Sequence, residues 1–172
     1  MKKHKMLYFD IETNASDFWP TLAGLKDLHC NSIYDPEASQ MHSFSSNANN
    51  LDEGVAMLNA SHNICGHNAI NFDAPALRKL GYEITARVVD TKVMSQVMHP
   101  DLFTEDCRRG EEFPKNLRGR HSLKAWGLRL GNEKDDHGAT EDWTQWSQEM
   151  QDYCEQDVNV VVDLFLHFMS GK

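Results

Sequence analysis

The sequence predicts an α/β protein in which a mixed central β-sheet is flanked by helices. Residues 5–13 alternate apolar and polar side chains, which is typical of a half-buried strand. Residues 28–35 and 40–44 are two further strand candidates around a Pro-containing turn, and helix and strand patterns alternate from residue 51 onward. An opening group of strands followed by such an alternation favours one sheet covered by helices.

The first strand ends on two acidic residues, Asp10 and Glu12. Because side chains alternate along a strand, both acids point to the face opposite Leu7, Phe9 and Ile11. Two carboxylates about 5 Å apart repel by roughly 3 kcal/mol at an effective dielectric constant near 20. Ionising both in a folded interior therefore requires a cation or a proton, and hard divalent ions such as Mg²⁺ prefer oxygen ligands. For this motif alone, the alternative is an exposed strand end with two solvated acids.

A third acid, Asp73, ends a segment that starts at Asn68, after a short strand candidate near 63–66. Asp73 is also a good helix N-cap, because Pro75 falls within the first turn, where its missing amide costs nothing. This segment by itself leaves open whether Asp73 only caps the helix or also contributes to a site.

The final helix, expected over roughly 144–169, carries an acid on an apolar face. Asp157 lies on a stripe with near-helical spacing that also contains Trp146, Met150, Tyr153, Val161, Leu164 and Phe168. A lone buried carboxylate costs several kcal/mol, so Asp157 requires a hydrogen-bond donor, a salt partner or a metal ion. The alternatives are a face that turns to solvent at Asp157, or an Arg partner elsewhere.

Capping and turn signals place the remaining elements. A polar loop at 45–50 precedes a helix from about 51, residues 87–89 form a strand, and 91–99 form a helix. Residues 100–120 show no regular pattern. Ser122 can cap a helix that stops at Gly131.

Charge is distributed unevenly. The formal net charge of −9 and the pI near 5.4 argue against a chain that coats nucleic acid through bulk charge. Residues 108–129 nevertheless hold seven basic and two acidic side chains, whereas 133–163 hold ten acids and a single Lys. The basic segment is a candidate phosphate track, with an ordinary solvated loop as the alternative.

The cysteine and hydropathy patterns exclude several other classes. The four cysteines show no paired spacing, which argues against a zinc site or a disulfide framework and favours reduced thiols. No apolar run reaches about 18 residues and no signal peptide opens the chain. We therefore expect a cytoplasmic protein, in the host cytoplasm if it is viral, without a membrane partner.

Taken together and in this order, the three acidic segments resemble the Exo I, Exo II and Exo III motifs of the DEDD family of 3′–5′ exonucleases. The match is to the tyrosine branch (DEDDy), because Tyr153 lies four residues before Asp157, whereas the histidine branch has a His at the position of Asp152. Over nearly its whole length the chain is similar to the proofreading exonuclease domain of family A DNA polymerases from short-tailed bacteriophages. The supporting segments include 9–12, 67–68, 90–91 and 121–131.

This resemblance implies a ribonuclease H-like fold and a metal-dependent 3′–5′ exonuclease. It would hydrolyse phosphodiester bonds at DNA 3′ ends and release nucleoside 5′-monophosphates, with two divalent cations, Mg²⁺ or Mn²⁺. By the same resemblance, Asp10 would bridge both ions. Glu12 and Asp157 would hold the ion that activates water, and Asp73 would serve the second ion. Tyr153 would orient the attacking water.

The resemblance also indicates how substrate binds. Asn68 resembles the family residue that contacts the terminal nucleotide, and Ile11 and Thr13 lie where backbone groups line the nucleotide pocket. The local charge excess adds Arg118 and Arg120 as substrate-binding candidates. The expected partner is DNA, with single-stranded 3′ ends as substrate, and a separate polymerase is a further candidate partner.

We expect residues 1–172 to form a single exonuclease domain without a polymerase domain, and we favour a separate gene product over an excised domain. Two alternatives remain open. An RNA exonuclease related to ribonuclease D would share the tyrosine pattern. A non-catalytic module of the same fold would bind nucleic acid or a polymerase.

Overall fold

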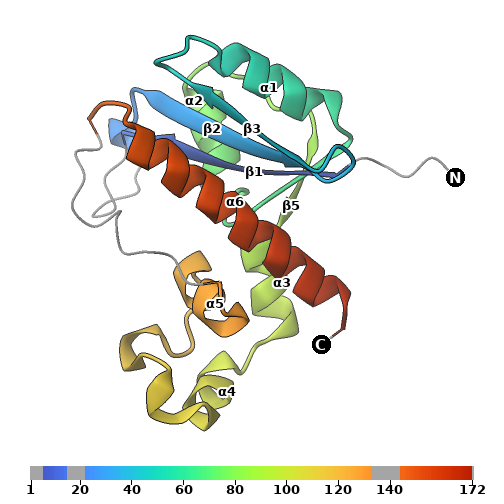
Figure 1. Cartoon of the computed structure of the whole chain (residues 1–172), viewed down its shortest axis with the longest axis vertical. Coiled ribbons are helices and arrows are strands. Elements are labelled where there is room, and N and C mark those ends of the chain that lie inside the picture. Colours follow the sequence, from blue (N-terminus) through green and yellow to red (C-terminus); the bar gives the residue numbers. More distant parts are fainter. Residues whose placement is uncertain (1–5, 15–21, 133–143, 172) are drawn as a thin grey trace, which may run out of the picture.

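The computed structural model describes residues 6–14, 22–132 and 144–171, in which five strands form one mixed sheet with the order β3-β2-β1-β4-β5 (Figure 1). The strands are β1 (Met6–Thr13), β2 (Leu28–Asp35), β3 (Gln40–Ser45), β4 (Asn63–Gly66) and β5 (Arg87–Asp90). Strand β1 lies at the centre, antiparallel to β2 and parallel to β4. Strand β3 extends the antiparallel side and β5 the parallel side, so the predicted mixed sheet is confirmed.

Helices cover both faces of this sheet. They are α1 (Leu51–Ala60), α2 (Asp73–Lys79), α3 (Thr91–Met98), α4 (Leu102–Arg108), α5 (Leu123–Leu130) and α6 (Gln148–Met169), with short 3₁₀ turns η1 (Leu22–Gly24), η2 (Gly110–Glu112) and η3 (Lys115–Leu117). Figure 1 shows α6 crossing the face of the sheet opposite α1 and α2. No helix in the described part of the chain is long and apolar enough to cross a membrane.

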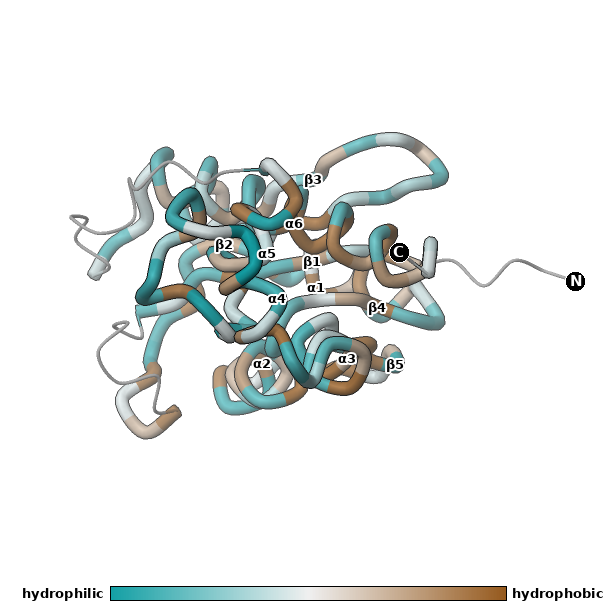
Figure 2. The backbone as a smooth tube through the Cα atoms, turned by 90° about the horizontal axis from the view of Figure 1, so that it is seen from below, coloured by the Kyte–Doolittle hydropathy of each residue, from teal (hydrophilic) through white to brown (hydrophobic). Residues whose placement is uncertain are grey.

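The alternation along β1 separates two apolar cores. Leu7 and Phe9 pack in a cluster with Leu58 of α1 and Leu77 of α2, whereas the intervening Tyr8 packs with residues of α5 and α6. In Figure 2 the hydrophobic segments gather where α6 lies next to β1, and hydrophilic segments occupy outer loops. The face of β1 that carries Asp10 and Glu12 is therefore the face covered by α6.

Helix α6 begins later than the apolar stripe predicts. Ser147 is its N-cap, with a hydroxyl that accepts a hydrogen bond from the Met150 amide at 3.1 Å, so the expected start at 144 is wrong and Trp146 precedes the helix. The signals for α5 are confirmed, because Ser122 accepts from the Ala125 amide and Gly131 adopts a φ of 72°.

The segment 100–120, predicted to be irregular, contains α4, η2 and η3. The reason is a tertiary contact that no local pattern reveals. Arg129 of α5 donates two hydrogen bonds, of 2.9 and 2.7 Å, to the fully buried Asp106 of α4. This pair joins a short helix to a distant one and supplies the ordering that the segment's own sequence lacks.

Candidate active site

A cavity of about 180 Å³ lies where the carboxyl end of β1, the loop before α2 and the first half of α6 meet. Its lining residues are Asp10, Ile11, Glu12, His67, Asn68, Phe72, Asp73, Tyr153 and Asp157. The acids of all three motifs, and the tyrosine, therefore share one cavity although their segments lie far apart in the sequence.

Strand β1 brings Asp10 and Glu12 together as its alternation predicts. One carboxylate oxygen from each lies within 4.8 Å of the other and of the Cys154 sulfur on α6. Cys154 is fully buried, and its thiol donates a hydrogen bond to the backbone carbonyl of Asp10 at 3.4 Å. Helix α6 is thus fastened to β1 directly beside the two acids.

Asp73 is buried at the start of α2 and faces the same acids. It is the first helical residue, and Phe72 precedes it in the N-cap position, so Asp73 is not the cap that its sequence allows. Burial raises the pKa of Asp73 well above its usual value, and the charge of Asp10 raises it further. Backbone hydrogen bonds, including one from Ile11, oppose this shift. The Ile11 amide is therefore occupied by Asp73.

Helix α6 supplies the remaining two motif residues from adjacent turns of one face. Asp157 is 8% exposed and Tyr153 is half-buried. Both line the cavity, whereas the neighbouring Asp152 is exposed and accepts a hydrogen bond from Gln148. The stripe that marked Asp157 as an anomaly thus points this acid toward Asp10 and Glu12.

The loop between β4 and α2 is held by Asp90 and Lys92, for which the sequence predicts no contact with this loop. Asn68 has a φ of 65°, in the left-handed region. The Asp90 carboxylate, which caps α3, also accepts hydrogen bonds from the amides of Asn68 at 2.9 Å and Ile70 at 3.0 Å. The Lys92 ammonium donates to Asn68 Oδ1 at 3.1 Å. An Asp-Thr pair before a helix predicts a cap, but not this second task.

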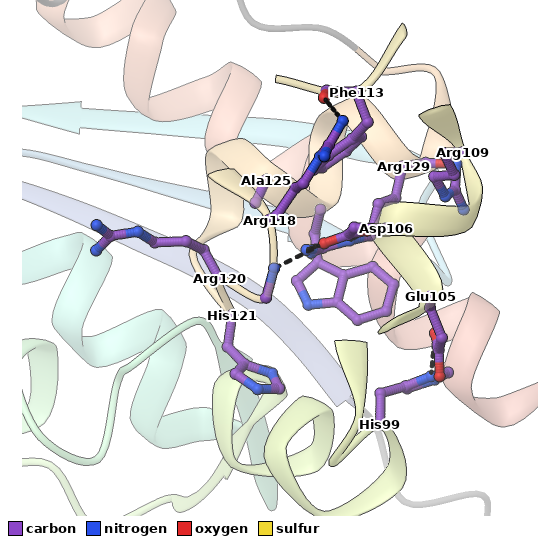
Figure 3. Close-up of polar contacts among 12 residues, drawn as sticks. His99, Glu105, Asp106, Arg109, Phe113, Arg118, Arg120, His121, Ala125 and Arg129 are labelled. Carbon is purple, nitrogen blue, oxygen red and sulfur yellow. Dashed lines mark hydrogen bonds and ion pairs between the residues drawn. The ribbon is translucent and has the colours of Figure 1, made fainter. Parts of the chain in front are cut away.

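The substrate-binding candidates are placed differently from one another. Ile11 and Asn68 line the cavity, whereas Thr13 is buried and is not among its lining residues. The Arg118 guanidinium donates to the carbonyls of Gly110 and Phe113 in its own loop (Figure 3).

Arg120 is exposed, and its Nε donates to the Asn116 carbonyl at 3.2 Å. In Figure 3 its side chain extends away from the Asp106–Arg129 pair. Neither Arg118 nor Arg120 lines the cavity.

In sequence, the chain is similar to two viral polymerases. It is 30% identical to the DNA-directed DNA polymerase of Enterobacteria phage T3 and to that of Escherichia phage T7, over 97% of this chain. In both cases the chain spans 27% of the length of the relative. No family model matches the chain.

In fold, the chain is similar to NrnC from Brucella melitensis, with a TM-score of 0.65 at 15% identity over 98% of this chain and 73% of NrnC. It also resembles the family B DNA polymerase of the archaeon Pyrobaculum calidifontis, with a TM-score of 0.57 at 13% identity over 96% of this chain and 24% of the polymerase. At such identities the likeness is one of fold. The comparisons confirm the resemblance to phage polymerases and the ribonuclease H-like fold that the sequence predicts.

Proposed function

We propose that this chain is a member of the DEDD exonuclease family and a metal-dependent 3′–5′ exonuclease that hydrolyses phosphodiester bonds at DNA 3′ ends. The observation that carries the proposal is the shared cavity of four acids and Tyr153, contributed by β1, the start of α2 and α6. Carboxylates that repel one another in a partly buried cavity lower the stability of the fold, so a purely structural role does not explain them.

The donor set fits divalent cations. Asp10, Glu12, Asp73 and Asp157 offer carboxylate oxygens, the ligands that Mg²⁺ and Mn²⁺ prefer. The raised pKa of Asp73 supports this assignment, since part of its cause is the negative charge of Asp10, which a bound cation would neutralise. When bound, two such ions would activate a water for in-line attack at phosphorus and stabilise the leaving 3′ oxygen.

The remaining residues would act on the nucleotide and the water. Tyr153 lies one turn before Asp157 and lines the same cavity, and its hydroxyl would orient the attacking water. The side-chain NH₂ group of Asn68 would donate to the terminal nucleotide. Ile11 lines the cavity, but its amide is already bonded to Asp73, so it would contact the nucleotide through its remaining groups.

We place DNA before RNA as the substrate because the relatives in sequence are DNA polymerases. Hydrolysis with water as the nucleophile would release nucleoside 5′-monophosphates from single-stranded 3′ ends. In this proposal residues 1–172 act as one exonuclease domain in a host cytoplasm, with or without a separate polymerase.

A time course with purified protein tests the function. Oligonucleotides labelled at the 5′ end should yield a ladder that shortens one nucleotide at a time, and 3′-labelled ones should release labelled mononucleotide at once. Chelator should stop both reactions. Faster degradation of an RNA oligonucleotide of the same sequence would indicate RNA as the substrate instead of DNA. Binding of the oligonucleotide without degradation would favour a non-catalytic binding module.

Two Asp→Asn substitutions, which change charge but not side-chain size, test whether the activity resides in the cavity. Asp10→Asn should abolish degradation, whereas Asp152→Asn should keep it, because Asp152 is exposed and lies next to Tyr153 without lining the cavity. Unchanged digestion by Asp10→Asn would remove the metal assignment.

A further inference from the structure

We propose that Lys92, at the start of α3, is a positioning residue that orients the Asn68 amide toward the 3′-terminal nucleotide. The Lys92 ammonium donates a hydrogen bond to Asn68 Oδ1 at 3.1 Å. This role rests on the proposed exonuclease function, because Lys92 would act through a residue of that cavity. Lys92 belongs to none of the three acidic motifs.

The chemistry of the two groups fixes the direction of the amide. An ammonium group can only donate hydrogen bonds, so its partner on Asn68 is the oxygen and not the nitrogen. Because the amide is planar, its NH₂ group then points away from Lys92. Asn68 lines the cavity together with Phe72 and Asp73. The NH₂ group is thereby presented as a donor for an oxygen or a ring nitrogen of a bound nucleotide.

Backbone contacts hold Asn68 and Lys92 to the same anchor. Asp90 Oδ1 accepts from the Asn68 amide at 2.9 Å and from the Lys92 amide at 2.8 Å. Asn68 also adopts a positive φ of 65°, a strained conformation that such contacts maintain. A further hydrogen bond, of 3.0 Å, joins His67 Nδ1 in the loop to Thr91 Oγ1 at the start of α3. The loop and the first turn of α3 therefore form one unit, in which the Lys92 side chain holds the Asn68 side-chain amide.

Helix α3 also contacts the basic segment, through Ser95 and His121. The pKa of His121 is lowered, first by burial and then by neighbouring positive charges that include Lys92. His121 in turn bonds to Ser95 of α3, at 2.6 Å, and directly follows Arg120.

A double-mutant cycle tests the role. Oligonucleotide affinity is measured by fluorescence anisotropy in chelator, where no hydrolysis is needed, for the wild type, Lys92→Met, Asn68→Ala and the double variant. Without Lys92 the Asn68 side chain is no longer oriented, so Lys92→Met should lose most of the Asn68 hydrogen bond to the nucleotide and bind about five- to tenfold more weakly. The double variant should bind no more weakly than Asn68→Ala alone, because Lys92 acts through Asn68.

Controls separate positioning from charge and from folding. Lys92→Arg keeps a donor for Oδ1 and should restore most of the affinity, whereas Arg78→Met removes an exposed positive charge on α2 and should leave affinity unchanged. With metal present, Lys92→Met should raise KM more than it lowers kcat. If Lys92→Met does not fold, as judged by its melting temperature, Lys92→Leu, which also lacks a donor, replaces it.

Two results would overturn the inference. Unchanged affinity in Lys92→Met would mean that Asn68 needs no orientation, and equal losses with and without Asn68 would mean that Lys92 contacts the nucleic acid directly. A third outcome is that the wild type binds oligonucleotide and the four affinities agree with the double-mutant prediction, while no DNA is degraded. That outcome would contradict the proposed exonuclease activity but would support the role of Lys92 in orienting Asn68 for nucleotide binding. A wild type that binds no oligonucleotide would remove both.

Discussion

Asp73 is the residue at which activity and stability conflict most directly. It is 4% exposed, and burial together with the charge of Asp10 raises its pKa. A carboxyl whose folded-state pKa is raised lowers the free energy of unfolding at every pH above its unfolded-state pKa, which includes neutral pH. A residue kept there despite this effect serves a purpose other than folding.

We therefore predict that Asp73→Asn raises the melting temperature in chelator and lowers the rate of 3′-end degradation by at least about a hundredfold. Outer partners of metal ligands cost about 10–100-fold when mutated, and Asp73 would serve the second ion from within the cavity, so we expect a loss at or above the upper end of that range. Thermal denaturation and initial rates measure the two effects. A lower melting temperature would show that the hydrogen bond from Ile11 outweighs the repulsion.

Tyr153 offers a second test at this scale. The Tyr153→Phe variant keeps the ring, which packs at the edge of the cavity, and removes only the hydroxyl. We expect kcat to fall by about 100–1000-fold, the range for a positioned hydrogen-bonding group, while oligonucleotide affinity stays within about twofold. Equal losses in kcat and affinity would indicate that the ring has a structural role alone.

At the scale of elements, the segment that carries the basic residues is built around a buried ion pair. Arg129 is sandwiched near the rings of Phe113 and Trp126, at 5.2 and 4.8 Å from their centroids, and forms the two hydrogen bonds to Asp106. The Gly119 amide also donates to Asp106, at 2.9 Å (Figure 3). This pair holds α4, α5 and the loop before α5 together.

Breaking that pair should be costly. Arg129→Met leaves the Asp106 carboxylate buried without its partner, which we expect to cost about 3–5 kcal/mol in chemical denaturation at pH 7. Asp106→Leu combined with Arg129→Met should cost less than Arg129→Met alone, since no charge is left buried. Additive losses would contradict this account of the pair.

The same pair predicts a pH dependence. Burial raises the pKa of Asp106, but hydrogen bonds from Arg129 and the Gly119 amide outweigh it, so the pKa lies below its usual value. The contribution is therefore fully present above the unfolded-state pKa and is lost as the pH falls through the lower folded-state pKa. The wild type should lose stability over that acidic range more steeply than the Asp106→Leu, Arg129→Met variant.

Arg118 and Arg120 lie in the loop between α4 and α5, and we expect charge reversal at the two positions to have different effects. Arg118 bonds to carbonyls of its own loop, so Arg118→Glu should lower the melting temperature. Arg120 is exposed, so Arg120→Glu should leave the melting temperature unchanged and weaken DNA binding, with a shallower salt dependence. An unaltered salt dependence in Arg120→Glu would assign this loop to structure only.

The elements also show what a sequence can predict. The acids of β1 and α6 were identifiable because strand and helix periods are local, and a carboxylate on an apolar face stands out against them. The hydrogen bonds of Asp90 and Lys92 to Asn68 could not be predicted, because Asn68 lies in a separate loop and contacts between distant segments leave no periodic pattern in the sequence. Helix α4 was missed for the same reason, since Asp106 is paired with a residue on another helix.

For the whole molecule, the cavity exists only when the sheet and α6 have assembled. Cys154 bonds to the Asp10 carbonyl, and Gln151 of α6 donates to the Ser32 hydroxyl of β2 at 2.8 Å. The ligand set therefore comes from β1, the start of α2 and α6, and the unfolded chain has no equivalent site. A cation that binds this cavity must stabilise the entire fold.

We accordingly predict that Mg²⁺ or Mn²⁺ raises the melting temperature of the wild type. At one hundred times the dissociation constant the gain is about 2.7 kcal/mol, which corresponds to roughly 5–10 °C for a domain of this size. Asp10→Asn and Asp157→Asn should each reduce the shift, because each removes a ligand from a different end of the chain, while Asp152→Asn should keep it in full. A shift of equal size in all three variants would mean that the ions bind elsewhere, and the carboxylates of the cavity would then need another explanation.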